Sequence, residues 1–467
     1  MLNFTKIGPE SAGLLEKYYR SCTYRLCEYS VGVKIMWREH WAPEYAESHG
    51  CLIVLNHSRR NGFFFDFPVA LPGQGDVEAA LEEIEAWCLD HEVSPAFGDV
   101  PQEMVHVLTE RYPYVSLESS RLWQDYLYDI GELAAFVGRK YSGQRNHINK
   151  FHRLFPDARY KALTPEDRPA LELFWERYHD TANKSSPDAR REICYAWRMM
   201  DHIGEDWVRA GAIVLGEEIL AISLGEVCGE TLICHIEKGL SGYDGVYPAM
   251  VQSFAAANRE GVRFLNREDD AGEAGLRTSK LQYLPLSLES KHRVMAKNEL
   301  HSLRAVPELR TERLTLTALR DEDQYDYNRL CTDDALNKWW GYDFRDDLHE
   351  DLTADYFLKV AREDLAAGQA LNLAIRLEGR FIGEVVLYHF DCKGGAELGC
   401  RILREHGGHG YGTETFQAMA MWSLYELGLY VLRGKCCKEN EPSRRMLSSC
   451  MRPAGEDETF FYFEKRV

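Results

Sequence analysis

The sequence predicts an α+β protein of two or three domains, in which mixed, mostly antiparallel sheets are flanked by helices. The chain has 467 residues, which is too long for one average domain. Between residues 212 and 260, three strand-like runs separated by short Gly-Glu turns precede a helix-like run. Between residues 397 and 427, a strand-like run, a glycine-rich turn and a helix-like run follow one another.

The composition sets limits on the partners and on the compartment. Hydrophobic residues make up 45% of the chain and aromatic residues 12%, which predicts large packed cores. The formal net charge is −19, so nucleic acid or an anionic membrane would need a local basic patch. No apolar run has the length of a membrane span, and residues 1–6 lack the apolar core of a signal peptide. The 13 scattered cysteines contain no C-x-x-C pair, which indicates reduced thiols, a cytoplasmic protein and no metal site.

Strands and helices alternate in the first two-thirds of the chain. Asp76 suits the N-cap of an acidic amphipathic helix, and Pro248 suits the first turn of another. Strands are expected at the apolar runs 51–55, 212–215, 220–227, 231–237, 262–265 and 283–288. Helices are expected at residues 76–91, 174–183 and 248–260. The runs from 212 to 237 should pair as an antiparallel meander.

Residues 138–155 combine an apolar helix face with a basic cluster. Tyr141, Ile148, Phe151 and Phe155 recur at helical spacing. The basic residues between and beside them are Arg139, Lys140, Arg145, His147, Lys150, His152 and Arg153. Such a cluster could receive the phosphate of a tRNA end or of a nucleotide. The alternative is a solvated helix face whose cations pair with the abundant carboxylates.

A second charged group follows the strand expected at residues 262–265. Glu268, Asp269 and Asp270 could hold a cationic amine. Arg277 and Lys280 could hold a carboxylate or a phosphate. The alternative is a helix cap with a network of ion pairs, and the residues alone leave both interpretations open.

The most informative turn is Gly407-Gly408-His409-Gly410-Tyr411-Gly412-Thr413, between the strand at 397–403 and the helix at 413–427. Four glycines in six positions leave the backbone amides uncovered. The helix that follows adds unsatisfied N–H groups and the positive end of its dipole. The turn therefore predicts a pyrophosphate cradle.

These residues resemble the GNAT acyltransferase superfamily, above all its ribosomal-protein N-acetyltransferases. The resemblance rests on the opening residues 309–316, Glu397-Leu398-Gly399, the turn, and Asn440-Glu441-Pro442-Ser443. It implies that the last third of the chain binds acetyl-coenzyme A through Ile402, Leu403, the turn and Asn440. The chain departs from the family pattern at Gly407, where Gln or Arg is frequent, and at Met451-Arg452-Pro453, where Gly-Phe is usual.

Acyl transfer from a thioester to an amine requires a base for the ammonium and an acid for the leaving thiolate. Glu397 is the candidate base, and its alternative is an exposed strand residue. Ser443 is the candidate donor to the coenzyme sulfur, although Asn440 and Ser443 are also common helix-capping residues. Tyr462 is a weaker candidate acid. Residues 339–342 (Trp-Trp-Gly-Tyr) could enclose a small-molecule or peptide amine, or could form a packing cluster.

Three other blocks resemble the catalytic domain of phosphatidylglycerol lysyltransferases and their soluble relatives. They are residues 138–151, His235-Ile236-Glu237-Lys238 with Tyr247-Pro248-Ala249, and residues 266–280. The resemblance implies a tandem pair of GNAT-like folds with aminoacyl-tRNA as donor. It assigns a second site to Arg145, Asn146, His147, Lys238, Arg267, Glu268, Asp269, Arg277 and Lys280.

The two resemblances together predict three GNAT-like domains, at residues 1–135, 136–298 and 309–467, with a linker at 299–308. One predicted function is an acetyl-CoA-dependent N-acetyltransferase in the C-terminal domain. A second is an aminoacyl-tRNA-dependent aminoacyltransferase in the tandem unit, and a third is a non-catalytic coenzyme-binding or scaffold protein. The identity of the amine, the acyl chain length and the oligomeric state stay open.

Overall fold

The computed structural model describes residues 2–58, 62–181, 187–340, 343–346, 348 and 352–467, without the side chains of 180–193 and 346. The chain forms two compact units. The first unit consists of Met1–Ile84, Ala96–His106 and Leu117–Val294. The second unit consists of Glu85–Pro95, Val107–Ser116 and Met295–Val467.

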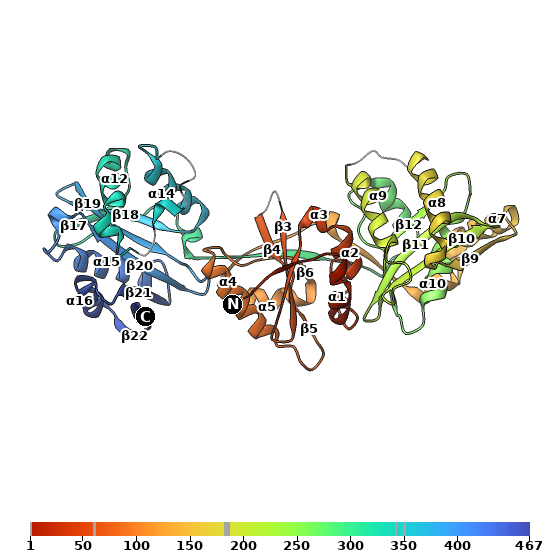
Figure 1. The fold of residues 1–467 in the computed structure, drawn as a ribbon, viewed down its shortest axis with the longest axis horizontal. Helices are drawn as coiled ribbons and strands as arrows, with labels where there is room; N and C mark the ends of the chain where they lie inside the picture. The colour runs from red at the N-terminus through yellow and green to blue at the C-terminus, as the bar shows by residue number, and fades with distance from the viewer. Residues whose placement is uncertain (1, 59–61, 182–186, 341–342, 347, 349–351) are drawn as a thin grey trace. The chain divides into compact units, whose positions relative to one another are not determined.

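Three mixed sheets flanked by helices confirm the predicted fold class (Figure 1). The first sheet has the order β1-β2-β3-β4-β6-β15-β7, and β5 also pairs with β3. Its strands are β1 Thr5–Lys6, β2 Glu44–Ser48, β3 Cys51–Ser58, β4 Gly62–Phe65, β5 Val69–Ala70, β6 Ala96–Pro101, β7 Tyr114–Ser119 and β15 Lys291–Lys297. The helices of this stretch are α1 Ala12–Tyr19, α2 Val31–Met36, α3 Arg38–Trp41, α4 Val77–Asp90 and α5 Val105–Arg111. Asp76 caps α4 as predicted, because its Oδ1 accepts the backbone N–H of Ala79 at 3.1 Å.

The second sheet contains the predicted antiparallel meander, β10-β11-β12. Its order is β14-β8-β13-β12-β11-β10-β9. Its strands are β8 Asp125–Asp129, β9 Ala158–Ala162, β10 Val208–Leu215, β11 Glu218–Cys228, β12 Thr231–Gly239, β13 Phe264–Asn266 and β14 Ser287–Glu289. Its helices are α6 Ile130–Ala135, α7 Ser142–Leu154, α8 Arg168–Thr181, α9 Pro187–Met200, α10 Val246–Asn258 and α11 Ala274–Leu281.

The strand predicted at 283–288 is wrong for most of its length. Only Ser287 and Leu288 of that run lie in β14, and Leu284 has φ +55°, a left-handed conformation that ends the segment after α11. The predicted domain boundaries at residues 135 and 298 stay a prediction.

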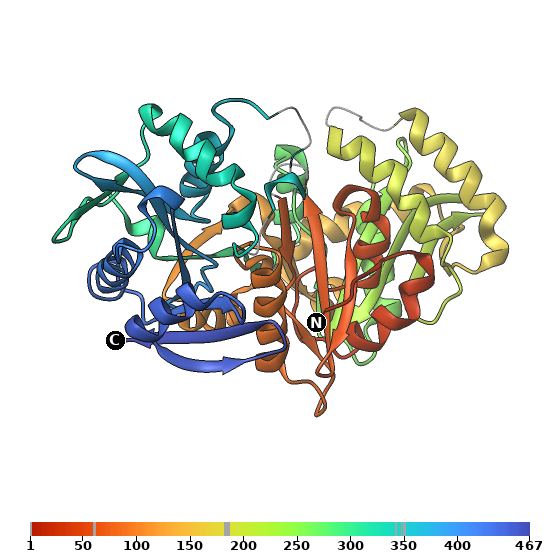
Figure 2. The ribbon, with the colours of Figure 1, turned by 60° about the vertical axis from the view of Figure 1, so that its left-hand side comes forward.

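The third sheet has the order β16-β17-β18-β19-β20-β21-β23-β22. Its strands are β16 Leu309–Arg310, β17 Leu314–Ala318, β18 Leu371–Leu377, β19 Arg380–Tyr388, β20 Gly395–Ile402, β21 Val431–Cys437, β22 Arg452–Glu456 and β23 Phe460–Arg466. Its helices are α12 Gln324–Thr332, α13 Asp334–Asn337, α14 Tyr356–Ala367, α15 Tyr411–Tyr425 and α16 Glu441–Cys450. The β22–β23 hairpin, dark blue beside the C-terminus in Figure 2, forms one edge of this sheet.

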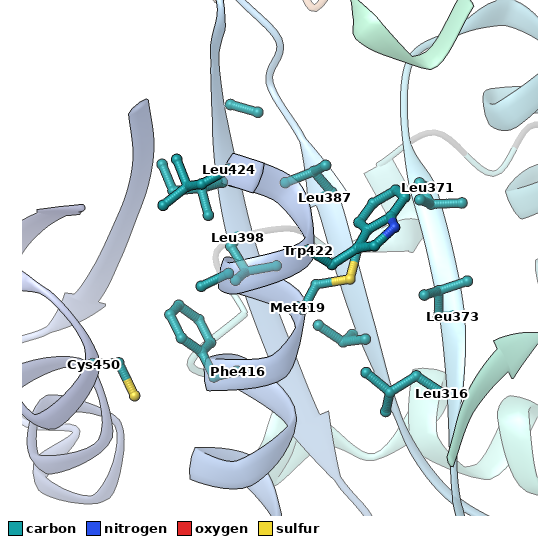
Figure 3. Close-up of a cluster of buried hydrophobic side chains, with 14 of the residues drawn as sticks. Leu316, Leu371, Leu373, Leu387, Leu398, Phe416, Met419, Trp422, Leu424 and Cys450 are labelled. Atoms are coloured by element: carbon teal, nitrogen blue, oxygen red, sulfur yellow. The ribbon is translucent and has the colours of Figure 1, made fainter. Parts of the chain in front are cut away.

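One face of the third sheet is the core beneath α15. Phe416, Met419 and Trp422 of α15 are buried in one cluster with strand residues such as Leu387 and Leu398 (Figure 3). Because successive strand residues alternate between faces, the neighbours of Leu387 and Leu398 point away from this core. The opposite face of the sheet is therefore left to the polar residues of the site.

Candidate functional site

Strands β20 and β21 separate in the middle of the third sheet. They pair in parallel at Gly395–Val431, Ala396–Leu432 and Glu397–Arg433. Beyond Glu397, β20 continues to Ile402 and β21 to Cys437, and the described residues record no further pairing between the two strands. Backbone polar groups that face this opening have no sheet partner, so they can bind an extended ligand.

The predicted glycine turn leads from β20 into α15 and is exposed from Gly407 to Gly410. Gly408 and Gly410 both have φ +79°, a conformation that glycine adopts without steric cost. The first backbone bond into the helix runs from Glu414 N to Gly410 O at 3.1 Å. Within the described chain, the N–H groups of Tyr411, Gly412 and Thr413 have no backbone acceptor. The turn is therefore open, and the positive end of the α15 dipole adds to its attraction for an anion.

Arg313, which the sequence interpretation missed, brings a cation to this turn. Its Nη1 donates to the carbonyl of His409 at 2.9 Å, and its Nε donates to Glu414 Oε2 at 2.7 Å. The guanidinium lies 4.7 Å from the ring centroid of Tyr411, and that ring stacks on His409. A guanidinium therefore lies beside the turn, where Glu414 balances its charge, although Gly407 itself has no side chain.

The inner wall of the opening is made of small and sulfur-containing groups. Cys400 Sγ lies 3.7 Å from Met446 Sδ. A Cβ on Gly412 would lie 3.5 Å from Met446 Sδ, which is an ordinary contact distance, so α15 and α16 pack against each other here without requiring glycine. Ile402 is half-buried at the end of β20, whereas Leu403 is buried and its N–H donates to Ile382 O at 2.9 Å. Leu403 is thus a core residue of this unit.

Glu397 lies at the point where the strands part, and its side chain is 19% exposed. Its Oε1 is 3.4 Å from His389 Nδ1, and its Oε2 is 3.5 Å from Lys435 Nζ. Burial raises the pKa of Glu397, but His389 and Lys435 outweigh burial and hold that pKa below its usual value. Glu397 is therefore a charged, largely buried carboxylate rather than an exposed strand residue.

His389 connects Glu397 to a second carboxylate. The other ring nitrogen of His389, Nε2, lies 2.7 Å from Glu92 Oε1. Burial lowers the pKa of His389, but the bonds to Glu397 and Glu92 prevail and raise it to about 9. Glu397, His389 and Glu92 thus form a continuous charged row.

Asn440 caps α16, which is one of the two roles predicted for it, whereas Ser443 only supplies the backbone N–H that the cap accepts. Asn440 Oδ1 accepts the backbone N–H of Ser443 at 3.2 Å. Ser443 is half-buried. Tyr462 donates its hydroxyl to Asp457 Oδ2 at 2.6 Å. The Tyr462 hydroxyl is therefore engaged by Asp457 and not by the opening.

A cavity of about 460 Å³ lies on the polar face of the third sheet. The strand residues that line it include Asn372, Glu384, Val386, Tyr388 and Arg401. Charged and aromatic residues from outside these strands also line it: Glu92, Tyr327, Trp340, Phe344, Phe357, Asp364, His389 and Lys435. Trp340 reaches the sheet, because a Cβ on Gly399 would lie 3.2 Å from its ring. Gly341 and Tyr342, predicted beside this pocket, lie outside the described residues.

The first unit contains a second opening between parallel strands. Strands β12 and β13 pair only from Thr231–Phe264 to Ile233–Asn266, while β12 continues to Gly239. Lys238 lies on this continuation of β12, opposite Ile222 of β11. The second opening therefore repeats the arrangement of the third sheet.

Several predicted second-site residues form the internal network that was the alternative interpretation. Arg277 makes two bonds to Asp270, at 2.8 and 3.0 Å. Arg267 Nη2 lies 2.6 Å from Glu237. Lys280 donates to the backbone carbonyls of Arg267, Glu268 and Asp269. Glu268 and Asp269 keep side chains that are 29% and 35% exposed, so both carboxylates remain partly accessible to solvent.

The basic block on α7 is partly neutralised. Arg145 donates to the carbonyls of Phe136 and Gly138, and Lys150 pairs with Asp244 at 2.5 Å. Lys140 pairs with Glu132 at 2.6 Å. The exposed members without a recorded side-chain partner in the described structure are Arg139, Asn146, His147 and Arg153, while the His152 ring contacts Phe151. The block thus keeps an exposed positive surface, but Arg145 has a structural use.

His235 is fully buried between two carboxylates of the first unit. Its Nε2 lies 2.9 Å from Glu226 and its Nδ1 lies 2.8 Å from Glu268. Burial lowers the pKa of His235, but the two carboxylates outweigh burial and raise it from 6.5 to about 9. Protonated His235 therefore stabilises the folded unit fully below pH 6.5, and that contribution is lost as pH rises through about 9.

We expect the free energy of unfolding of the first unit to fall between pH 6.5 and about 9. Urea titrations across this range measure the slope. In His235→Gln the fall should become shallower, whereas His57→Gln, which changes a histidine that is 47% exposed, should keep it. Equal slopes in His235→Gln and the wild type would contradict this account.

Cys27, Glu28 and Asp125 form a cluster that resembles a metal site, with ligand atoms within 4.8 Å of one another. Lys291 Nζ lies among them, 2.8 Å from Asp125, 2.5 Å from Glu28 and 3.4 Å from Cys27 Sγ. An ammonium therefore already provides the positive charge in the cluster, which is a buried ion-pair network.

Among the described residues, no helix is long and apolar enough to cross a membrane.

The first part of the chain matches a known protein family. The family model for the C-terminal region of phosphatidylglycerol lysyltransferase matches residues 20–294, more than half of the chain. The chain belongs to this family. A model of the GNAT acetyltransferase domain matches residues 313–450 of this lysyltransferase-family protein. Both resemblances are thereby confirmed, and the lysyltransferase-family protein is an acyltransferase.

Solved structures resemble either part of the lysyltransferase-family protein. A conserved protein of unknown function from Bacteroides thetaiotaomicron VPI-5482 is 25% identical, covers 63% of this chain and 99% of its own, and has a TM-score of 0.55. RimJ of Mycobacterium smegmatis, solved with CoA-disulfide, is 20% identical over 35% of this chain and 87% of its own, with a TM-score of 0.30. The C-terminal domain of a putative lysylphosphatidylglycerol synthetase from Agrobacterium fabrum is 12% identical, over 57% and 86%, with a TM-score of 0.41. No curated protein matches the chain.

Proposed function

We propose that the C-terminal part of the chain is an N-acetyltransferase that uses acetyl-CoA and a primary amine. The observation that carries the proposal is the opening of β20 from β21 directly before the exposed glycine turn of α15. The free N–H groups of Tyr411, Gly412 and Thr413, together with Arg313, suit a diphosphate. The opening between the strands suits an extended pantetheine arm, because unpaired strand groups can bond to its amides.

In this proposal, different residues of the chain bind the coenzyme and transfer the protons. Residues 407–413 and Arg313 hold the diphosphate, and Asn440 lies beside the arm. Bound acetyl-CoA supplies an activated thioester carbonyl. Glu397 accepts a proton from the ammonium, directly or through water, and Ser443 donates a proton to the sulfur. Overall, an amide C–N bond forms as the thioester C–S bond breaks. The ammonium loses two protons: Glu397 takes the first and passes it to solvent, and the second replaces the proton that Ser443 gives to the thiolate.

Glu397 is the preferred base among the carboxylates near the cavity. Glu384 is 1% exposed, and it already bonds to Arg401 and to the Tyr327 hydroxyl. Glu397 instead has one buried oxygen, Oε2, that lacks a hydrogen-bond partner within the described structure, and Lys435 Nζ lies 3.5 Å from it. That oxygen can accept a proton or a water without loss of an existing hydrogen bond.

Calorimetry with acetyl-CoA and the full chain tests the proposal. We expect binding, followed by release of free thiol when a primary amine is added. Absence of binding at millimolar acetyl-CoA would exclude the proposal. Binding without transfer to any amine would instead favour the non-catalytic coenzyme-binding protein. A parallel titration with longer acyl-CoA thioesters would measure the preference for acyl length.

We expect Arg313→Met to weaken acetyl-CoA binding by about tenfold, which corresponds to one charge-assisted hydrogen bond. The dependence of binding on salt should also become weaker, because one cation near the diphosphate is lost. Arg310→Met is the matched control, since Arg310 is 78% exposed and pairs with Glu308. Unchanged affinity in Arg313→Met would remove Arg313 from the coenzyme site.

We also propose a second transfer site in the tandem unit, with aminoacyl-tRNA as donor. The supporting observation is the opening of β12 from β13, with Glu268 and Asp269 partly exposed just after β13. Exposed Arg139 and Arg153 offer cations for phosphate. Filter binding of tRNA over a range of salt concentrations tests this site. Binding that is undetectable or insensitive to salt would exclude tRNA.

A further inference from the structure

The cavity on the polar face of the third sheet contains carboxylates in unequal environments. Glu384 is neutralised by Arg401, and Glu92 by His389. Lys435 lies 3.5 Å from Glu397. These charges are therefore balanced within the cavity and do not by themselves demand a charged ligand.

Asp364 differs from these residues. It lies half-buried near the end of α14, and the described structure records no cation or hydrogen-bond donor on its side chain. Burial, followed by the charges of Glu92 and Glu363, raises the pKa of Asp364 to about 6. Near neutral pH this group is thus an ionised, poorly solvated carboxylate whose charged neighbours are also acidic. A cation in the cavity would relieve that cost.

A second group in the cavity also lacks a partner. Asn372 Oδ1 is buried and accepts no hydrogen bond within the described structure. Asn372 Nδ2 faces Glu384 Oε2 at 3.3 Å and the Tyr327 hydroxyl at 3.5 Å, which fixes the amide with its oxygen as the free atom. This oxygen can accept an N–H group of a ligand.

The walls between these polar groups are aromatic. Tyr327, Trp340, Phe344 and Phe357 all line the cavity. Aromatic faces accommodate methylene groups and attract ammonium ions by cation–π interaction. The cavity therefore has apolar walls. It contains the Asp364 carboxylate on α14, and the row of Glu92, His389 and Glu397 lies near the sheet.

We propose that the cavity binds the acceptor amine and selects one that carries a second positive charge, which Asp364 holds. The chemical class is a diamine or a lysine derivative, in which methylene groups separate the reacting amine from the second ammonium. This inference rests on the proposed function for the transfer step, whereas recognition of the second ammonium rests on Asp364, Asn372 and the aromatic walls alone.

Acyl transfer to two amines of equal length tests whether the cavity prefers an amine with a second positive charge. The full chain is assayed with acetyl-CoA and either 1,5-diaminopentane or 1-aminopentane at neutral pH. We expect kcat/KM to be about 10- to 100-fold higher for the diamine, the range of one hydrogen bond to a charged group. Asp364→Asn should lower the diamine value to that of the monoamine and leave both monoamine turnover and acetyl-CoA affinity unchanged.

Glu363→Gln is the matched control, because Glu363 is the adjacent carboxylate, is 65% exposed and pairs with Lys359. It should not change the preference for the diamine. If Asp364→Asn does not fold, Asp364→Ser takes its place, and thermal melting identifies the folded variant.

The possible outcomes are distinct. Equal kcat/KM for the two amines, or an unchanged preference in Asp364→Asn, would overturn the inference. If no amine is acetylated, the proposed function fails, and calorimetry with the diamine alone decides the inference. Binding of the diamine that is weakened about tenfold or more in Asp364→Asn would support the inference, and equal binding to both proteins would refute it.

Discussion

Glu397→Gln is expected to lower kcat for acyl transfer by about 10²- to 10⁴-fold, the usual contribution of a general base. Glutamine keeps the shape of the side chain but cannot accept the proton of the ammonium. The affinity for acetyl-CoA should stay the same, because the glycine turn and Arg313 hold the diphosphate at a separate place. Steady-state thiol release measures kcat, and calorimetry measures the affinity.

Glu405→Gln is the control for Glu397→Gln. Glu405 also precedes the glycine turn, but its side chain is 49% exposed and pairs with Arg329 on the surface. This variant should keep full activity, because surface ion pairs contribute little. If Glu397→Gln retains wild-type kcat, Glu397 is a structural partner of His389, and the base must be sought elsewhere in the cavity.

The largest effect on stability is expected for Lys291→Met. Lys291 is 2% exposed and bonds to Asp125, which is fully buried, and to Glu28. Loss of the ammonium leaves the buried Asp125 carboxylate and the 18% exposed Glu28 carboxylate without a cation, which typically costs about 3–5 kcal/mol. Urea unfolding of the first unit, followed separately from that of the second, should show this loss as a lower midpoint.

Two further variants test whether the loss of stability comes from the carboxylates that Lys291 neutralises. Lys17→Met removes a lysine that is 52% exposed and pairs with Glu47, so we expect a change below about 1 kcal/mol. Adding Asp125→Asn to Lys291→Met removes one of the stranded charges, so the double variant should recover part of the loss. A cost below about 1 kcal/mol for Lys291→Met would mean that the cluster is hydrated or is protonated when Lys291 is absent.

Local patterns in the sequence were sufficient for the elements that depend on neighbouring residues. The meander from 208 to 239, the Asp76 cap and the turn at 407–413 follow from alternation, capping chemistry and glycine within short segments. Leu284 shows the limit of such patterns. An apolar run predicted a strand there, but the chain turns after α11 with φ +55°.

The candidate sites were only partly predictable for the same reason. Arg267, Arg277 and Lys280 attracted attention as charged residues, yet their partners are Glu237, Asp270 and backbone carbonyls of the same block. A charged side chain in a sequence does not reveal whether a carboxylate or a ligand will neutralise it. Asp364 was missed because nothing near it in the chain distinguishes it from the other acidic residues.

By itself, the sequence predicted the meander, the Asp76 cap and the exposed glycine turn of this protein, since each depends on residues that are close together in the chain. Only the tertiary structure decided which charges meet. Arg313 reaches His409 across 96 residues, and His389 reaches Glu92 across 297. The pKa of a buried group depends on burial and on partners within a few ångströms, and folding brings those partners from distant parts of the chain.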